Sequence, residues 1–192
     1  GEGTLNDMSL AQDNPFLHVM DAAMLFITPR ALTLPLGFRP AGLEATGTRQ
    51  TLTAVDNTAL ALTDHPAFRG PRPPRDLPVA VLMAKSDELE QAPGVQVRFE
   101  SLPLDGQFLA DPDACLDEVG EEPFRVLSQF GGVALVTRVV QFTRVRSFHA
   151  VSAMGCAPGE NEVFEKVAPF NVVDPLLATL YHLGMIGDRD GE

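Results

Sequence analysis

Motifs that identify a reaction or a cofactor are missing from this sequence. It holds no GxSxG, no Walker phosphate loop, no GxGxxG dinucleotide fingerprint and no CxxC pair. Its four histidines form no HxH or HxxxH pair, so it carries no zinc signature. Many enzymes have no short motif, so these absences do not exclude catalysis. Nothing favours it either, and we expect a protein that is not an enzyme and has no cofactor.

Lysine is nearly absent, and basic charge is scarce. The chain has two Lys and twelve Arg against 26 Asp and Glu, which gives a formal net charge of −12. Proteins that bind nucleic acid or anionic membranes need a basic footprint, which this balance does not supply. No uncharged apolar run reaches the roughly 18 residues of a membrane span, and the first residues, GEGTLNDMSL, lack the pattern of a signal peptide.

Cysteine is also rare, with only Cys115 and Cys156. The two could form one disulfide, but the sequence does not place them within bonding distance. We favour two free buried thiols. Cys156 follows His149 by seven residues. A thiolate nucleophile needs a base and an orienting group, and no recognisable spacing supplies either.

The patterns that are present favour strands over helices. Residues 49–64 alternate apolar residues with Thr around Asp56 and Asn57, which predicts a hairpin. Residues 79–84 and 95–102 predict a second hairpin. We therefore expect a β-rich α+β fold, an antiparallel sandwich or open barrel. A doubly wound α/β fold is less favoured, because no Gly-rich turn leads from a strand to a helix.

Two covering helices are expected, at about 14–27 and 174–184. The first begins with a capping Asn14 followed by Pro15. The second begins with a capping Asp174 followed by Pro175, and it ends at Gly184. With 45% apolar residues in 192, the chain can build one core. We expect a flexible arm over 1–13, a single globular domain over 14–187 and a solvated tail over 188–192.

The segment 131–155 carries three arginines and no acid. The three arginines are Arg138, Arg144 and Arg146. If 133–149 were one strand, all three would lie on the same face as Phe142. That strand would extend about 55 Å, which is unusually long, so a bend near Gln141 is expected.

The segment 105–122 is the opposite in charge, with seven acids and no base. One interpretation pairs it with the arginine face inside the same chain through Arg–carboxylate contacts. The other makes the arginine face a site for an anion or for the acidic segment of another copy. Phosphate of a nucleic acid is disfavoured, because the remaining surface would repel it.

The same acidic segment contains oxygen ligands at a calcium-loop spacing. They stand at positions one, three, seven and twelve, as Asp111, Asp113, Asp117 and Glu122. A calcium loop also needs a glycine where Leu116 stands and a ligand where Cys115 stands. We expect a solvated acidic loop, with a Ca²⁺ site as the alternative.

These patterns together predict an interaction module without catalysis. It would self-assemble or dock on a larger complex through opposite-charge patches, as a shell, tail or capsid-accessory component does. The arm 1–13 and the Pro/Arg loop 65–78 would contact neighbours, the loop through Arg69, Arg72 and Arg75. The alternative is an enzyme or small-ligand binder that uses the arginine face as an anion-binding cleft.

Overall fold

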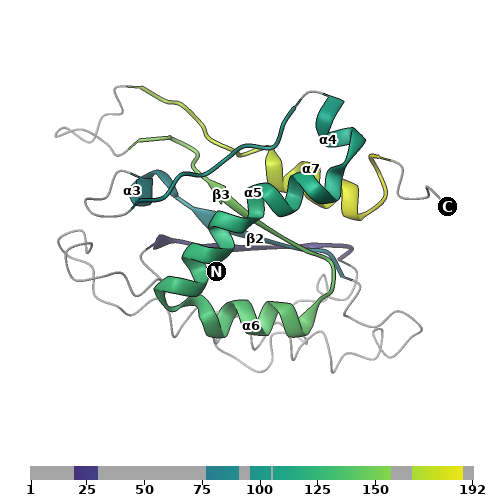
Figure 1. Ribbon diagram of the computed structural model, residues 1–192, viewed down its shortest axis with the longest axis horizontal. Helices are drawn as coiled ribbons and strands as arrows, with labels where there is room; N and C mark the ends of the chain where they lie inside the picture. The colour runs from purple at the N-terminus through teal and green to yellow at the C-terminus, as the bar shows by residue number, and fades with distance from the viewer. Residues whose placement is uncertain (1–19, 30–76, 91–95, 105, 157–165, 188–192) are drawn as a thin grey trace.

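The computed structural model describes residues 20–29, 77–90, 96–104, 106–156 and 166–187. They form one open sheet of three parallel strands in the order β1-β2-β3, with helices on both sides (Figure 1). The strands are β1 (Ala23–Ile27), β2 (Val79–Ala84) and β3 (Arg146–Val151). The expected antiparallel sandwich or open barrel is therefore wrong, and the described fold is of the α/β kind.

The composition of β2 explains the parallel pairing. All six residues are apolar and the first five are buried. A strand that is buried on both faces has a continuous run of apolar residues, whereas a strand buried on one face alternates apolar and polar residues. The strand at 79–84 is thus confirmed, but the expected hairpin over 79–102 is wrong. Residues 96–104 contain no strand, and β2 pairs with β1 and β3 instead.

β1 lies in the segment 14–27, which the sequence predicts to be a helix. Ala23 pairs with Val79 and Ile27 with Met83, so the helical prediction is wrong over these five residues. Residues 14–19 lie outside the described part. The run AMLFI is too short and too uniformly apolar for its periodicity to separate helix from strand, and pairing with β2 decides.

The chain between β2 and β3 is mainly helical. It contains α3 (Asp87–Glu90), α4 (Gly106–Ala110), α5 (Pro112–Leu127), a π-helical turn η7 (Ser128–Gly132) and α6 (Val133–Phe142). Asp111 caps α5, because its Oδ1 accepts a hydrogen bond from the Ala114 N–H at 3.1 Å. The acidic segment is thus mainly helix rather than the expected loop.

The long strand predicted at 133–149 is wrong. Its first ten residues form α6, and β3 begins only at Arg146. Val136 and Val139, three positions apart, are buried, whereas Val133 and Val140 are exposed. This is the spacing of one helix face. Its burial outweighs the preference of β-branched residues for strands, which is a weak and context-dependent one.

The main core lies between the sheet and helices α5 and α6. Its largest fully buried members come from the sheet and from α3, α5 and α6: Val79, Val81, Met83, Leu89, Val126, Leu127 and Val139. A second cluster joins α4, the first half of α5 and α7 through Phe108, Leu116, Val119 and Tyr181. These two clusters fix α5 along the edge strand β3.

Helix α7 (Asp174–His182) lies on the side of the sheet opposite α6 (Figure 1). It confirms the predicted helix 174–184 and its end, because Gly184 has a φ of +70°. The Gly184 N–H donates to the Tyr181 carbonyl at 2.8 Å and the Met185 N–H to the Leu180 carbonyl at 2.9 Å, as in a Schellman motif. The predicted cap is wrong, since Val173 occupies the N-cap position and Asp174 lies inside the first turn.

Several expectations fall on residues that the structure does not describe. These are the arm 1–13, the hairpin 49–64, the tail 188–192 and all but the last two residues of the loop 65–78. Within the described ranges, no helix is long and apolar enough to cross a membrane. Neither cysteine forms a disulfide; Cys115 is buried as expected, and Cys156 is only half-buried.

Candidate functional site

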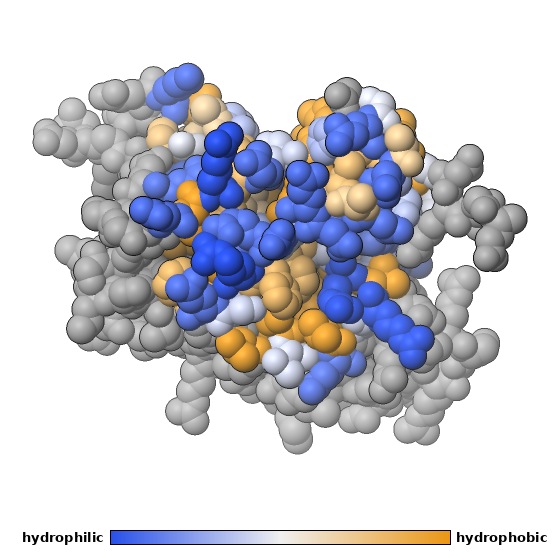
Figure 2. Space-filling model, in the orientation of Figure 1, coloured by the Kyte–Doolittle hydropathy of each residue, from blue (hydrophilic) through white to orange (hydrophobic). Residues whose placement is uncertain are grey.

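An open groove of about 440 Å³ lies between α5 and the start of β3. One wall comes from residues 113–124 of α5, the other from residues 144–148, and His182 at the end of α7 adds to the lining. The lining residues are Asp113, Leu116, Asp117, Gly120, Glu121, Phe124, Arg144, Val145, Arg146, Ser147, Phe148 and His182. Figure 2 shows the mixed character of this side of the molecule, with hydrophilic residues around α5 and hydrophobic residues gathered near α6.

The wall on α5 is acidic. Asp113, Asp117 and Glu121 are spaced by four positions, so the turn of the helix places them in one row on the same face. All three residues are exposed. The capping of α5 at Asp111 and the burial of its opposite face fix the direction of this row.

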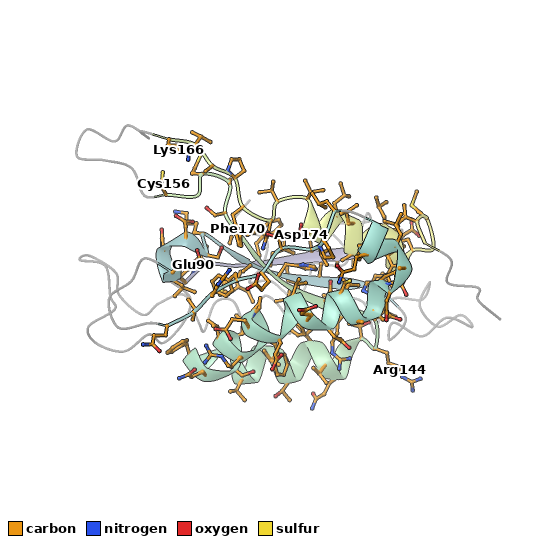
Figure 3. The ribbon with its side chains drawn as sticks, turned by 45° about the horizontal axis from the view of Figure 1, so that its top comes forward. Glu90, Arg144, Cys156, Lys166, Phe170 and Asp174 are labelled. Atoms are coloured by element: carbon orange, nitrogen blue, oxygen red, sulfur yellow. The ribbon has the colours of Figure 1, made fainter. Side chains whose placement is uncertain are left out.

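The facing wall carries two arginines. Arg146 begins β3, and its Nη1 donates to the backbone carbonyls of Thr143 and Arg144, both at 3.3 Å. Arg144 extends outward from the body of the protein, at the rim of the groove (Figure 3). The ion pairs among the described residues are Lys85–Glu88, Arg98–Glu100 and Arg125–Glu122, and none of them joins the two walls.

The floor of the groove is apolar and tightly packed. The rings of Phe124 and Phe148 meet edge to face, with centroids 5.2 Å apart. Gly120 lies against the backbone of Phe148, where an added Cβ would stand 3.5 Å from the Phe148 oxygen. This distance is an ordinary van der Waals contact, so α5 packs directly against the backbone of β3 at this point.

A buried polar pair lies behind the groove. His149 Nε2 and Ser147 Oγ are 2.9 Å apart, on the face of β3 opposite the main core. Burial lowers the pKa of His149 to about 4, with a smaller contribution from the charge of His182. His149 is therefore neutral at pH 7, and its ring and the Ser147 hydroxyl bring no net charge to the site.

The structure brings together some of the predicted interaction residues. Arg144 and Arg146 meet the acids of the segment 105–122 across the groove, but without ion pairs between the two walls in the described part. Arg138 and Phe142 lie on α6, not on a strand beside these arginines, and their side chains are outside the description. The loop arginines, Arg69, Arg72 and Arg75, also lie outside the described residues.

The four residues with calcium-loop spacing lie at the N-cap of α5 and along the helix, and they do not gather at one point. Asp111 caps the helix, and Asp113 and Asp117 line the groove. Glu122 accepts two hydrogen bonds from Arg125, each at 2.6 Å, and the bond to this carboxylate raises the pKa of Arg125. Within the described ranges, no group of three or more His, Cys, Asp or Glu side chains is placed to hold a metal ion.

His149 and Cys156, the pair considered for thiol chemistry, have different partners. His149 contacts Ser147, and Cys156 donates to the backbone carbonyl of Lys166 at 3.0 Å, where Figure 3 shows the two residues side by side. Cys156 lies beyond the carboxyl end of β3, whereas the groove lies at its amino end.

Sequence reasoning missed the role of the helix in this site. The four-residue spacing of Asp113, Asp117 and Glu121 is typical of one face of a helix, whereas the prediction for this segment is a loop. Phe124 and Ser147 carried no signal, because their places depend on how α5 crosses β3.

Comparison with known proteins found no match. That holds for protein-family models, for curated sequences and for solved structures alike.

Proposed function

We propose that this chain is a non-catalytic module that binds a small polar ligand in the groove between α5 and β3. Arg144 and Arg146 hold an acidic group of that ligand. The observation that carries the proposal is that both guanidinium groups line one groove, while no carboxylate of the described residues pairs with either. The planar guanidinium presents paired donors, which match the two oxygens of a carboxylate.

The size of the groove supports a small ligand. Its volume of about 440 Å³ is within the roughly 300–1,000 Å³ typical of small-molecule sites. The apolar floor under charged walls is also typical, because apolar contacts supply affinity and a few polar groups set orientation. A nucleic acid fits poorly, since the acidic wall would repel its phosphates.

The chemistry of the polar pair supports binding over catalysis. Ser147 lines the groove, and its hydroxyl lies beside the imidazole of His149. With a pKa of about 4, His149 is a poor base at neutral pH, because general bases work best when their pKa is near the working pH. The pair is suited to orienting the Ser147 hydroxyl rather than to activating it as a nucleophile.

The test is a screen of small carboxylates and amino acids by protein NMR. We expect ligands that bind to shift the backbone amides of residues 144–148 and of residues 113–124 on α5. The double variant Arg144→Gln, Arg146→Gln removes these shifts, while Arg98→Gln, an exposed arginine away from the groove, retains them. If no carboxylate in the screen shifted these amides at millimolar concentration, the proposed function would be wrong.

Self-association is a second candidate. Helix α7 and the residues beside it expose several large apolar side chains: Val172, Val173, Leu176, Leu183 and Met185. Exposed apolar clusters favour contacts with another protein surface. No observation on the described residues supports the predicted capsid or shell role, and the predicted β-sandwich is absent from the described fold.

A further inference from the structure

The groove contains more negative than positive charge. Its lining has three carboxylates, Asp113, Asp117 and Glu121, and two guanidinium groups, Arg144 and Arg146. The formal charge of the lining is therefore −1 when His182 is neutral. A ligand that carries only negative charge would gain at the arginines but be repelled by the acidic row.

We infer that the ligand is a zwitterion of the size of a short peptide, with its carboxylate at the arginine wall and its ammonium group at the acidic wall. This inference rests on the proposed function and specifies its ligand class. Each wall then meets a charge of opposite sign, so the two walls select for charge at both ends of one molecule.

The geometry of α5 suits a compact ammonium group. Four residues of helix rise about 6 Å, so Asp113 and Asp117 stand about one turn apart, and so do Asp117 and Glu121. An ammonium group has three donors and can lie between two carboxylates of such a row. Phe124 is 40% exposed beside the row, and its ring face can add a cation–π contact.

The remaining lining is neutral and partly apolar. Leu116, Phe124 and Phe148 form an apolar floor that suits the short side chains of a small peptide. Ser147 contributes a neutral hydroxyl, and its partner His149 is uncharged at pH 7. The five charged groups therefore decide which end of the ligand faces which wall.

The test uses three probes with the same dialanine body and different end groups, so that they differ in the charge at each end. Dialanine has both charges, N-acetyl-dialanine lacks the ammonium, and dialanine amide lacks the carboxylate. We expect dialanine to bind at least tenfold more tightly than either blocked form, measured by NMR titration at low salt. Low salt matters because exposed charges are screened over about 10 Å at 0.1 M.

Two variants then assign each end of the probe to a wall. Asp117→Asn should weaken dialanine binding at least fivefold, but it should not weaken the binding of N-acetyl-dialanine, which has no ammonium group to lose a partner. Arg146→Gln should weaken dialanine binding, but it should not weaken the binding of dialanine amide, which has no carboxylate. Glu118→Gln, an exposed acid of α5 outside the groove, should change neither. If Asp117→Asn lowers the melting temperature, Asp113→Asn replaces it.

The outcomes separate this inference from the proposed function. Binding of N-acetyl-dialanine as tight as that of dialanine would overturn the zwitterion and leave the arginine site standing. If carboxylates bind in the groove but none of the three peptides does, the zwitterion is again overturned and the arginine site is retained. Shifts outside the groove alone, or no binding by any probe or carboxylate, would overturn both.

Discussion

The backbone N–H of Leu102 donates a hydrogen bond to Oδ2 of Asp174 at 2.8 Å, although 72 positions separate the two residues. Both residues are buried, at 2% and 4% exposure. This bond ties the segment before α4 to the first turn of α7. It also explains why Asp174 does not cap its own helix, because its carboxylate is engaged elsewhere.

Replacing Asp174 tests this connection. Asp174→Ala leaves the buried Leu102 N–H without its acceptor, so we expect a loss of about 1–3 kcal/mol in the free energy of unfolding. Asp174→Asn retains an oxygen acceptor and should cost less than half as much. Urea denaturation at pH 7 measures both. Equal losses in the two variants would mean that the hydrogen bond is not the cause.

The pH dependence of the same residue has a defined sign. Burial raises the pKa of Asp174 above its usual 3.8, and the Leu102 N–H partly opposes this. The folded state then holds the proton more tightly than the unfolded state, so this carboxyl lowers stability as pH rises from 3.8 through its folded pKa. Asp174→Asn should remove that decrease, which a series of urea curves from pH 3.5 to 7 would show.

His149 gives the opposite pH dependence. Its pKa is about 4 in the folded protein and about 6.5 in the unfolded chain, so the unfolded state binds a proton first as pH falls. Wild type should lose roughly 3 kcal/mol from this residue between pH 6.5 and 4. His149→Gln retains a polar partner for Ser147 and should flatten that part of the stability curve. An unchanged slope in the variant would place the titrating group elsewhere.

Lys85 has a left-handed backbone, with a φ of +57°, between β2 and α3. This conformation costs a residue with a side chain about 1 kcal/mol. Its ion pair with Glu88, at 3.7 Å, is exposed and weak. Lys85→Gly should therefore stabilise the protein by about 0.5–1 kcal/mol despite the loss of the pair. Lys85→Gln, which retains the strain and removes the charge, should change thermal stability little, and a gain there would contradict the backbone argument.

Thr143 connects α6 to β3 and so positions both groove arginines. Its hydroxyl donates to the Leu77 carbonyl at 2.6 Å and accepts from the Val145 N–H at 3.1 Å. Thr143→Val retains the shape and removes both bonds, for an expected cost of about 1–3 kcal/mol. Thr137→Val, on an exposed site of α6, is the matched control and should stay within about 0.5 kcal/mol of wild type. A loss of the same size in the control would point to helix propensity instead.

Self-association is tested by sedimentation at two salt concentrations. If opposite-charge contacts join copies, a discrete assembly should form at low salt and loosen at high salt. Arg144→Glu with Arg146→Glu should disrupt it, and Leu176→Ser should do so if the apolar residues of α7 contribute. A monomer at both salts would exclude assembly. An assembly unchanged by the charge reversals would exclude the charged patches as its cause.

The sequence by itself determined the local elements whose signals are strong over a short range. The uniform apolar run of β2 predicts a buried strand, and Pro175 with Gly184 predicts the start and end of α7. It also determined the separation of charge, with acids in 105–122 and arginines in 131–155, and the expectation that the two segments face each other. Each of these depends on neighbours within a few positions or on composition alone.

Only the tertiary structure decided the pairing and the type of the ambiguous segments. AMLFI became a strand because β2 offered a parallel edge, and the β-branched run from Val133 became a helix because one of its faces is buried against the core. The groove depends on two further outcomes, the acids in one row of α5 and the arginines at the start of β3. Those positions follow from burial between layers far apart in the chain, which no local pattern encodes.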